Sequence, residues 1–253
     1  MSSPVLKNNT NFQERGMTNP FNGEALVDSS GTMTIENTIQ KTAMLFVVLL
    51  GFAAFAWLFL PPIALLPAAI VGLVLGLVNA FKKEPSVPLI LAYGAVEGIV
   101  LGLFSTFFEA MYPGIVIQAV LATLSVFAVV LVLFANGKVR ASKRATQIWL
   151  VATTGYILFS LINFVLMLTG SIDGMYGLRG VELGDTGIAL GIPLGILAIF
   201  LASYSLVMDF TLIQNGARNR IPERYGWQAA FGLAVTLIWL YLEIVRLIGI
   251  IRR

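Results

Sequence analysis

Seven long apolar segments, almost free of charge, fill most of the chain between residues 43 and 251 and restrict its fold more than any other feature. A bilayer core about 30 Å thick is crossed by roughly 20 helical residues that each rise about 1.5 Å. Pro61-Pro62 divides the first two segments, because proline removes an amide donor and fixes φ. The sequence therefore predicts an all-α integral membrane protein with seven transmembrane helices. The predicted spans are Ala43–Leu60, Ile63–Ala80, Pro88–Phe108, Gly114–Ala135, Ile148–Leu168, Gly187–Met208 and Trp227–Ile251.

The composition excludes several classes of function. Charged residues make up 11% of the chain and hydrophobic residues 58%, whereas a soluble domain carries about 25% charged residues. A soluble enzyme and a nucleic-acid-binding protein are both excluded, because the few charges lie in short clusters between apolar segments. The chain has no Cys and no His, so thiol and histidine chemistry are absent. We expect no enzymatic activity and no cofactor.

The N-terminal region differs from the rest of the chain. Residues 1–41 are polar, rich in Asn, and contain no long apolar run. We predict a disordered cytoplasmic tail over residues 1–41 that ends in a short helical lead-in near Thr34. Residues 42–253 then form the transmembrane domain.

The distribution of Lys and Arg predicts the orientation in the membrane. With the N-terminus inside, twelve basic residues fall on the inner side and three on the outer side, and Arg246 lies within a span. We therefore expect a cytoplasmic N-terminus and an outer C-terminus, although one re-entrant span would bring the C-terminus inside. The inner residues are Lys7, Arg15, Lys41, Lys82, Lys83, Lys138, Arg140, Lys143, Arg144, Arg218, Arg220 and Arg224, and the outer ones are Arg179, Arg252 and Arg253.

Glycines spaced four residues apart predict close helix packing. They occur in the third and sixth spans, and a pair occurs in the second. Small residues at this spacing form a smooth helix face on which another backbone can lie. The two triplets also suggest an inverted repeat of the kind found in transporters. The glycines are Gly94, Gly98 and Gly102, then Gly187, Gly191 and Gly195, and finally Gly72 and Gly76.

Four ionisable residues within or at the ends of the spans are the candidate functional residues: Glu97, Asp209, Glu243 and Arg246. Ionisable side chains are rare in spans and tend to mark functional sites. Two carboxylates brought together titrate as a coupled pair, which suits proton sensing, and their oxygens suit Ca²⁺. Simpler roles stay open, because Glu243 and Arg246 are spaced to neutralise each other on one helix. Asp209 is expected at the cytoplasmic end of its span, among the headgroups.

Four segments carry a resemblance to a known family: residues 205–209 (SLVMD), 240–244 (LYLEI), 92–98 (AYGAVEG) and 118–123 (QAVLAT). With the number and order of the helices, they make residues 40–250 resemble the Bax inhibitor-1/YccA family of transmembrane BAX-inhibitor-motif proteins. The similarity is greatest to a bacterial subgroup with a polar N-terminal tail. It implies a location in the bacterial plasma membrane.

The resemblance implies a central seventh helix wrapped by helices one to three and four to six. It also implies a pH-sensitive Ca²⁺ leak gated by an aspartate pair between helices six and seven. Asp209 matches the first aspartate and Glu243 occupies the place of the second, so both are the expected gate residues and possible Ca²⁺ ligands. Arg246 would modulate the gate, and Glu97 would line the same interior.

Several positions depart from the family's pattern. Glu243 replaces the usual aspartate, Phe210 stands where Thr is common, and Arg246 stands where a neutral residue is common. The stretch from Asp209 to Glu243 is also about ten residues longer than usual. If the last span begins at Trp227, Glu243 lies about 24 Å from the inner end, and the two carboxylates meet only if residues 227–236 largely precede the membrane. Otherwise Glu243 pairs with Glu97 or Arg246.

The leading hypothesis from the sequence is a pH-modulated cation leak, with Ca²⁺ as the candidate ion. In this hypothesis Asp209 and Glu243 share a proton in the closed state, and ionisation of both opens the pore. The main alternative is a non-conducting regulator that binds another membrane protein, such as a membrane protease. A small-solute transporter is a third possibility, suggested by the glycine triplets.

Overall fold

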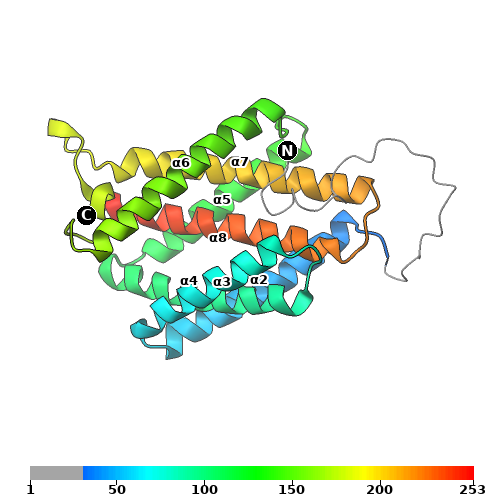
Figure 1. Cartoon of the computed structure of the whole chain (residues 1–253), viewed down its shortest axis with the longest axis horizontal. Helices are drawn as coiled ribbons and strands as arrows, with labels where there is room; N and C mark the ends of the chain where they lie inside the picture. Colours follow the sequence, from blue (N-terminus) through cyan, green and yellow to red (C-terminus); the bar gives the residue numbers. More distant parts are fainter. Residues whose placement is uncertain (1–30) are drawn as a thin grey trace. The chain divides into compact units, whose positions relative to one another are not determined.

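The computed structural model describes residues 31–253, and seven helices in this range are long and apolar enough to cross a membrane. This confirms the predicted all-α membrane fold. Short 3₁₀ turns η2 (Pro62–Ala64), η3 (Gly177–Gly180) and η4 (Gly184–Thr186) lie in the connections. The helices are α2 (Ile35–Phe59), α3 (Leu65–Phe81), α4 (Val87–Met111), α5 (Ile115–Ala135), α6 (Lys143–Leu168), α7 (Gly191–Arg218) and α8 (Tyr225–Ile251) (Figure 1).

The first helix begins earlier than the predicted span. Thr34 adopts an extended conformation and its hydroxyl accepts a hydrogen bond from the Asn37 amide at 3.1 Å, which caps α2. The helical lead-in near Thr34 is therefore confirmed, and it continues without a break into the first spanning helix. The predicted disorder of residues 1–30 lies outside the described residues.

The sixth span continues well beyond its predicted end. Helix α7 extends to Arg218, because Phe210, Leu212 and Ile213 remain buried after Met208. Asp209 consequently lies inside the helix and is buried, not at its cytoplasmic end. Hydropathy could not show this, since a helix can continue beyond the apolar stretch that crosses the bilayer.

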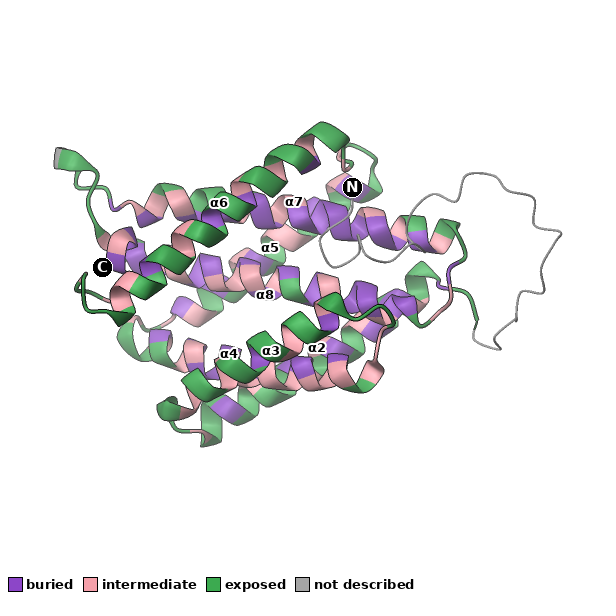
Figure 2. Ribbon diagram, in the orientation of Figure 1, coloured by how far each residue is buried: buried purple, intermediate pink, exposed green. Residues whose placement is uncertain are grey.

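The described chain divides into two compact units, and α4, α7 and α8 each contribute to both. The first unit holds residues 31–104 and 208–234, and the second holds residues 105–207 and 235–253. The last two helices are also the most buried, since about half of the core window of α7 and of α8 is buried, against 11% in α3 (Figure 2). Burial does not single out α8 from α7, so the predicted central position of the seventh span stays a prediction.

Glycines bring two helices of the first unit into close contact. A Cβ at Gly98 would overlap the carbonyl oxygen of Leu49 on α2, and one at Gly102 would overlap the carbonyl oxygen of Ala53. The glycine face predicted in the third span is thus the packing surface for α2. In the second unit Gly195 of the other triplet likewise lies against Leu247 of α8.

Polar contacts at one end of the first unit join α2 to the connection between α7 and α8. Lys41 Nζ donates to the Glu223 carbonyl oxygen at 2.8 Å and to Glu223 Oε1 at 3.0 Å. Arg224 pairs with Glu84 of the α3–α4 connection at 3.7 Å. The start of α2 therefore lies at the same end as these two connections.

Contacts at the C-terminus group another set of connections in the second unit. Arg252 donates to the Pro113 carbonyl oxygen between α4 and α5, and Arg253 donates to the Gly180 carbonyl oxygen between α6 and α7. The C-terminus therefore lies at the same end of this unit as the α4–α5 and α6–α7 connections. The orientation in the membrane stays a prediction.

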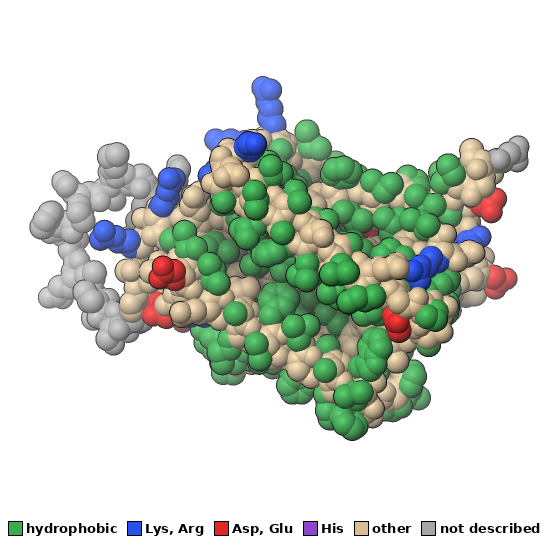
Figure 3. Space-filling view, turned by 180° about the vertical axis from the view of Figure 1, so that it is seen from behind, with side chains coloured by type: hydrophobic (Ala, Val, Ile, Leu, Met, Phe, Trp, Pro, Cys, Tyr) green, Lys and Arg blue, Asp and Glu red, His purple; other side chains and the backbone are tan. Residues whose placement is uncertain are grey.

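The outward faces of the helices suit lipid. Large hydrophobic side chains such as Val47, Leu58 and Val151 are exposed, and on the face drawn in Figure 3 hydrophobic side chains cover the helices. Such a surface is unfavourable in water and favourable in hydrocarbon, where the helices satisfy their own backbone hydrogen bonds.

The glycine contact predicts a large difference between two alanine substitutions. Gly98→Ala should lower the free energy of unfolding by about 1–3 kcal/mol, because the added Cβ forces α2 and α4 apart. Gly51→Ala on α2 is the control, since no atom lies within 4 Å of its Cβ position. Thermal unfolding in detergent would measure both variants, and equal melting temperatures would contradict the packing.

The Glu223 contact predicts a loss of stability in acid. Hydrogen bonds from Asn37 and Lys41, together with the charge of Lys41, hold the pKa of Glu223 below its usual 4.5. A lowered pKa stabilises the fold above pH 4.5, and this contribution is lost as the pH falls further. Melting curves in acid should therefore fall more steeply for the wild type than for Glu223→Gln. The exposed Glu182→Gln should behave as the wild type.

Candidate functional site

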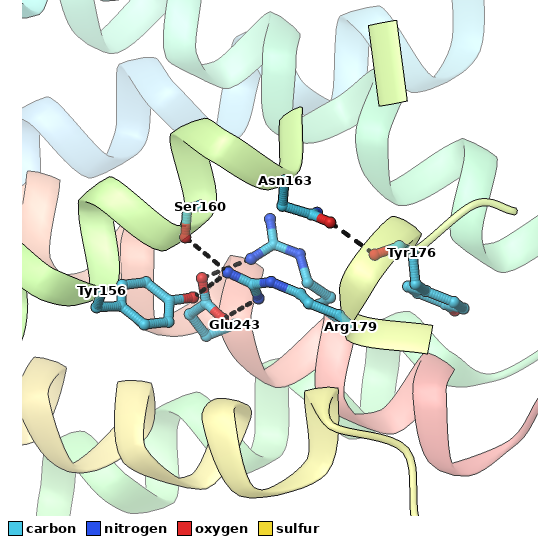
Figure 4. Close-up of polar contacts among 7 residues, drawn as sticks. Tyr156, Ser160, Asn163, Tyr176, Arg179 and Glu243 are labelled. Carbon is cyan, nitrogen blue, oxygen red and sulfur yellow. Dashed lines mark hydrogen bonds and ion pairs between the residues drawn. The ribbon is translucent and has the colours of Figure 1, made fainter. Parts of the chain in front are cut away.

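A cluster of charged and polar side chains lies inside the second unit, around Glu243 of α8 (Figure 4). Glu243 Oε1 accepts from Arg246 at 2.5 Å and Oε2 accepts from Arg179 at 3.2 Å. The side chains of Arg179 and Glu243 are only 5% and 4% exposed, so water does not screen this pair. We call Glu243, Arg179, Arg246, Tyr156 and Ser160 the Glu243 cluster.

Helix α6 contributes a polar stripe to the cluster. Tyr156, Ser160 and Asn163 are four and three residues apart, which places them on one helix face. Arg179 Nη2 donates to the Tyr156 hydroxyl at 2.6 Å and to Ser160 Oγ at 2.8 Å. The Arg179 guanidinium also lies 5.1 Å from the centre of the Tyr156 ring, where a cation–π attraction adds to the hydrogen bonds.

Arg179 does not come from a helix. It belongs to the 3₁₀ turn η3 in the α6–α7 loop, which spans residues 169–190. Arg179 was predicted only as one of the outer-side charges, and its contact with Glu243 was not predicted. A signal was present, because Arg179 is the only basic residue in that loop and stands between Gly177 and Gly180.

The pairing of Glu243 with Arg246 was one of the alternatives left open by the sequence, and the structure forms it. The three-residue spacing on one helix is enough to predict this contact. Arg246 is a more accessible partner than Arg179, since 29% of its side chain is exposed. The cluster thus brings two cations to one carboxylate.

Asp209 has a different environment. It lies in the first unit, where a Cβ at Gly232 of α8 would be 3.6 Å from Asp209 Oδ1. Gly232 precedes Glu243 by eleven residues on one continuous helix, or about 16 Å of helical rise. The partners of Glu243 are Arg179, Arg246 and Tyr156. The structure therefore does not form the Asp209–Glu243 pair, because α8 starts early and its first turns pack beside Asp209.

Glu97 is also separate from the Glu243 cluster. It lies on α4 in the first unit, hydrogen-bonded to Tyr93 one turn earlier, and its carboxylate fills the space left by Gly72 of α3. The structure gives Glu97 a contact between α3 and α4. Its predicted role in lining an interior pathway stays a prediction.

The described residues contain no group of three or more acidic side chains that could hold a metal ion. Both Glu243 oxygens accept from arginines, and two positive charges face one negative charge in a buried site. Such a cluster repels a cation in this state. The cluster is therefore unsuited to binding Ca²⁺ while both ion pairs are formed.

The fold and the cluster together define an all-α integral membrane protein with an ion-paired carboxylate buried among its helices. A family model described as Bax inhibitor 1 like matches residues 3–253, and the chain belongs to this family. A comparison with curated proteins finds no match. The family resemblance seen in the sequence is thereby confirmed.

The cluster predicts unequal effects of neutralising its charges. Glu243→Gln should lower the free energy of unfolding by about 3–5 kcal/mol, because it leaves Arg179 buried without a counter-charge. Arg246→Gln should cost about 1 kcal/mol or less, since Arg246 is partly exposed and Glu243 keeps Arg179. Thermal unfolding in detergent distinguishes the two variants, and equal losses would argue against a buried Arg179–Glu243 pair.

Proposed function

We propose that the protein is a pH-modulated cation leak, with Ca²⁺ as the first cation to test, and that the Glu243 cluster is its gate. The observation that carries the proposal is the buried carboxylate of Glu243 on a spanning helix, held by two arginines. Ionisable groups within spans are costly and commonly belong to ion pathways and gates. Family membership supports a membrane function, and the leak itself is our inference.

The origin of the two arginines suggests how the gate opens. Arg246 is fixed on the same helix as Glu243, whereas Arg179 is carried by a loop. A loop can move without unfolding a spanning helix. Withdrawal of Arg179 would remove one of the two positive charges from the cluster, together with the side chain that occupies it. Release of the α6–α7 loop is therefore the proposed opening step.

The partners of Glu243 also change the expected direction of the pH response. The hypothesis from the sequence opened the pore when two carboxylates ionised. With arginines as partners, the ionised carboxylate holds the loop closed, and a proton on Glu243 removes the attraction for Arg179. Under this proposal cation flux rises as the pH falls.

Flux through proteoliposomes tests the gate. The wild type should admit Ca²⁺ in a pH-dependent manner. Arg179→Gln should leak at alkaline pH at least about tenfold faster than the wild type and lose most of its pH dependence, because the closed state loses a buried ion pair. Arg179→Gln is the better test variant, because Glu243 still has Arg246 as a counter-charge when Arg179 is neutralised. Glu243→Gln would instead leave Arg179 buried without a counter-charge. Arg252→Gln, outside the cluster, should retain the wild-type profile.

Two further outcomes of the flux experiment would contradict the proposal. If Asp209→Asn abolishes the pH dependence while Arg179→Gln retains it, the gate lies at Asp209 and the role of the Glu243 cluster is wrong. If no variant conducts while a control channel does in the same vesicles, the leak proposal is overturned. The non-conducting regulator is then the function to test, by co-purification of a membrane partner with the wild type and Arg179→Gln.

A further inference from the structure

The α6–α7 loop leaves the surface and returns to it within a few residues. Asp173 and Gly174 are exposed, Tyr176, Gly177 and Arg179 are buried, and residues 181–184 are exposed again. Arg179 reaches the Glu243 cluster only because the middle of the loop lies among the helices. Specific contacts must hold it there, since buried backbone groups require hydrogen-bond partners.

Asn163 of α6 supplies two of those contacts with one side chain. Its Oδ1 accepts from the Leu178 amide at 2.6 Å, and its Nδ2 donates to the Tyr176 carbonyl oxygen at 3.4 Å. The amide thus binds the backbone on both sides of Gly177. Asn163 is 7% exposed, so water competes poorly for these hydrogen bonds.

Gly177 allows the loop to approach Asn163 this closely. Its φ is +54°, and a Cβ there would lie 2.5 Å from Asn163 Oδ1 and 2.7 Å from Met167 Cγ. Any side chain at this position would push the loop away from α6. Asn163 also shares its helix face with Tyr156 and Ser160, both of which bind Arg179.

We propose that Asn163 is a positioning residue, which docks the backbone of the α6–α7 loop so that Arg179 meets Glu243. The docking contact is made by neutral groups and lies outside the Glu243 cluster. That docking closes a cation path rests on the proposed function. The docking itself is independent of that function and is measured without ion flux.

Cysteine labelling measures docking directly, because the natural chain contains no Cys. We would introduce Leu178→Cys, a partly buried loop position, and follow its reaction with a membrane-impermeant maleimide in vesicles of each orientation. Adding Asn163→Ala should raise the labelling rate about tenfold, since the docked loop loses two hydrogen bonds. The matched control is Asn79→Ala, another buried Asn whose Nδ2 donates to the Leu75 and Leu89 carbonyl oxygens in the first unit.

A second pair of variants tests the same contact from the loop. Gly177→Ala should also raise the labelling rate, because its Cβ collides with Asn163. Gly174→Ala is the control in the same loop, since Gly174 has a φ of +104° but no atom within 4 Å of its Cβ position. Backbone strain alone would affect both variants, whereas undocking from Asn163 would affect only Gly177→Ala.

The outcomes separate this inference from the proposed function. If Asn163→Ala folds and labels at the wild-type rate, or no faster than Asn79→Ala, the positioning role is overturned. If labelling rises in Asn163→Ala but no variant conducts ions, the positioning role holds and the leak fails. If both proposals are correct, the Ca²⁺ flux of Asn163→Ala also begins to rise at a higher pH than that of the wild type. Asn79→Ala, which only loses stability, should not show this shift.

Discussion

The second unit is organised around one interaction with a large desolvation cost, the buried ion pair between Arg179 and Glu243. Removing two charges from water costs several kcal/mol per ion, and the cost is met only when further hydrogen bonds complete the partners. Tyr156, Ser160 and Arg246 provide them. The polar stripe on α6 supplies hydrogen bonds to this pair, and the inward course of the α6–α7 loop brings Arg179 to Glu243.

The same interaction explains why the loop is suited to a switch. A spanning helix holds its charges rigidly, whereas a loop places Arg179 through a small number of contacts. The cluster carries two positive charges and one negative charge. Under the proposed function, withdrawal of Arg179 breaks the buried ion pair and removes one of the two positive charges at the same time. Asp209 and Glu97 lie in the other unit among different contacts.

The sequence predicted the parts of this structure that depend on local pattern. Hydropathy and length located the seven spans, the proline pair located the α2–α3 break, and the three-residue spacing predicted the Glu243–Arg246 contact. The sequence did not predict that Arg179, a loop residue, is a partner of Glu243. Loop residues show no periodic pattern from which their position in the fold can be predicted. The position of Asp209 also escaped prediction, since hydropathy marks where a helix crosses the bilayer and not where the helix ends.

Charged and neutral contacts have separate roles in the docked loop. The hydrogen bonds between Asn163 and the backbone of Tyr176 and Leu178 involve no ionisable group, whereas the attraction between Arg179 and Glu243 requires an ionised carboxylate. If the neutral contacts alone kept the loop docked, protonation would have no effect. If they were absent, the ion pair would bear the whole entropic cost of ordering the loop. A pH-responsive loop therefore requires neutral contacts that are strong enough to position Arg179 and too weak to hold the loop without it.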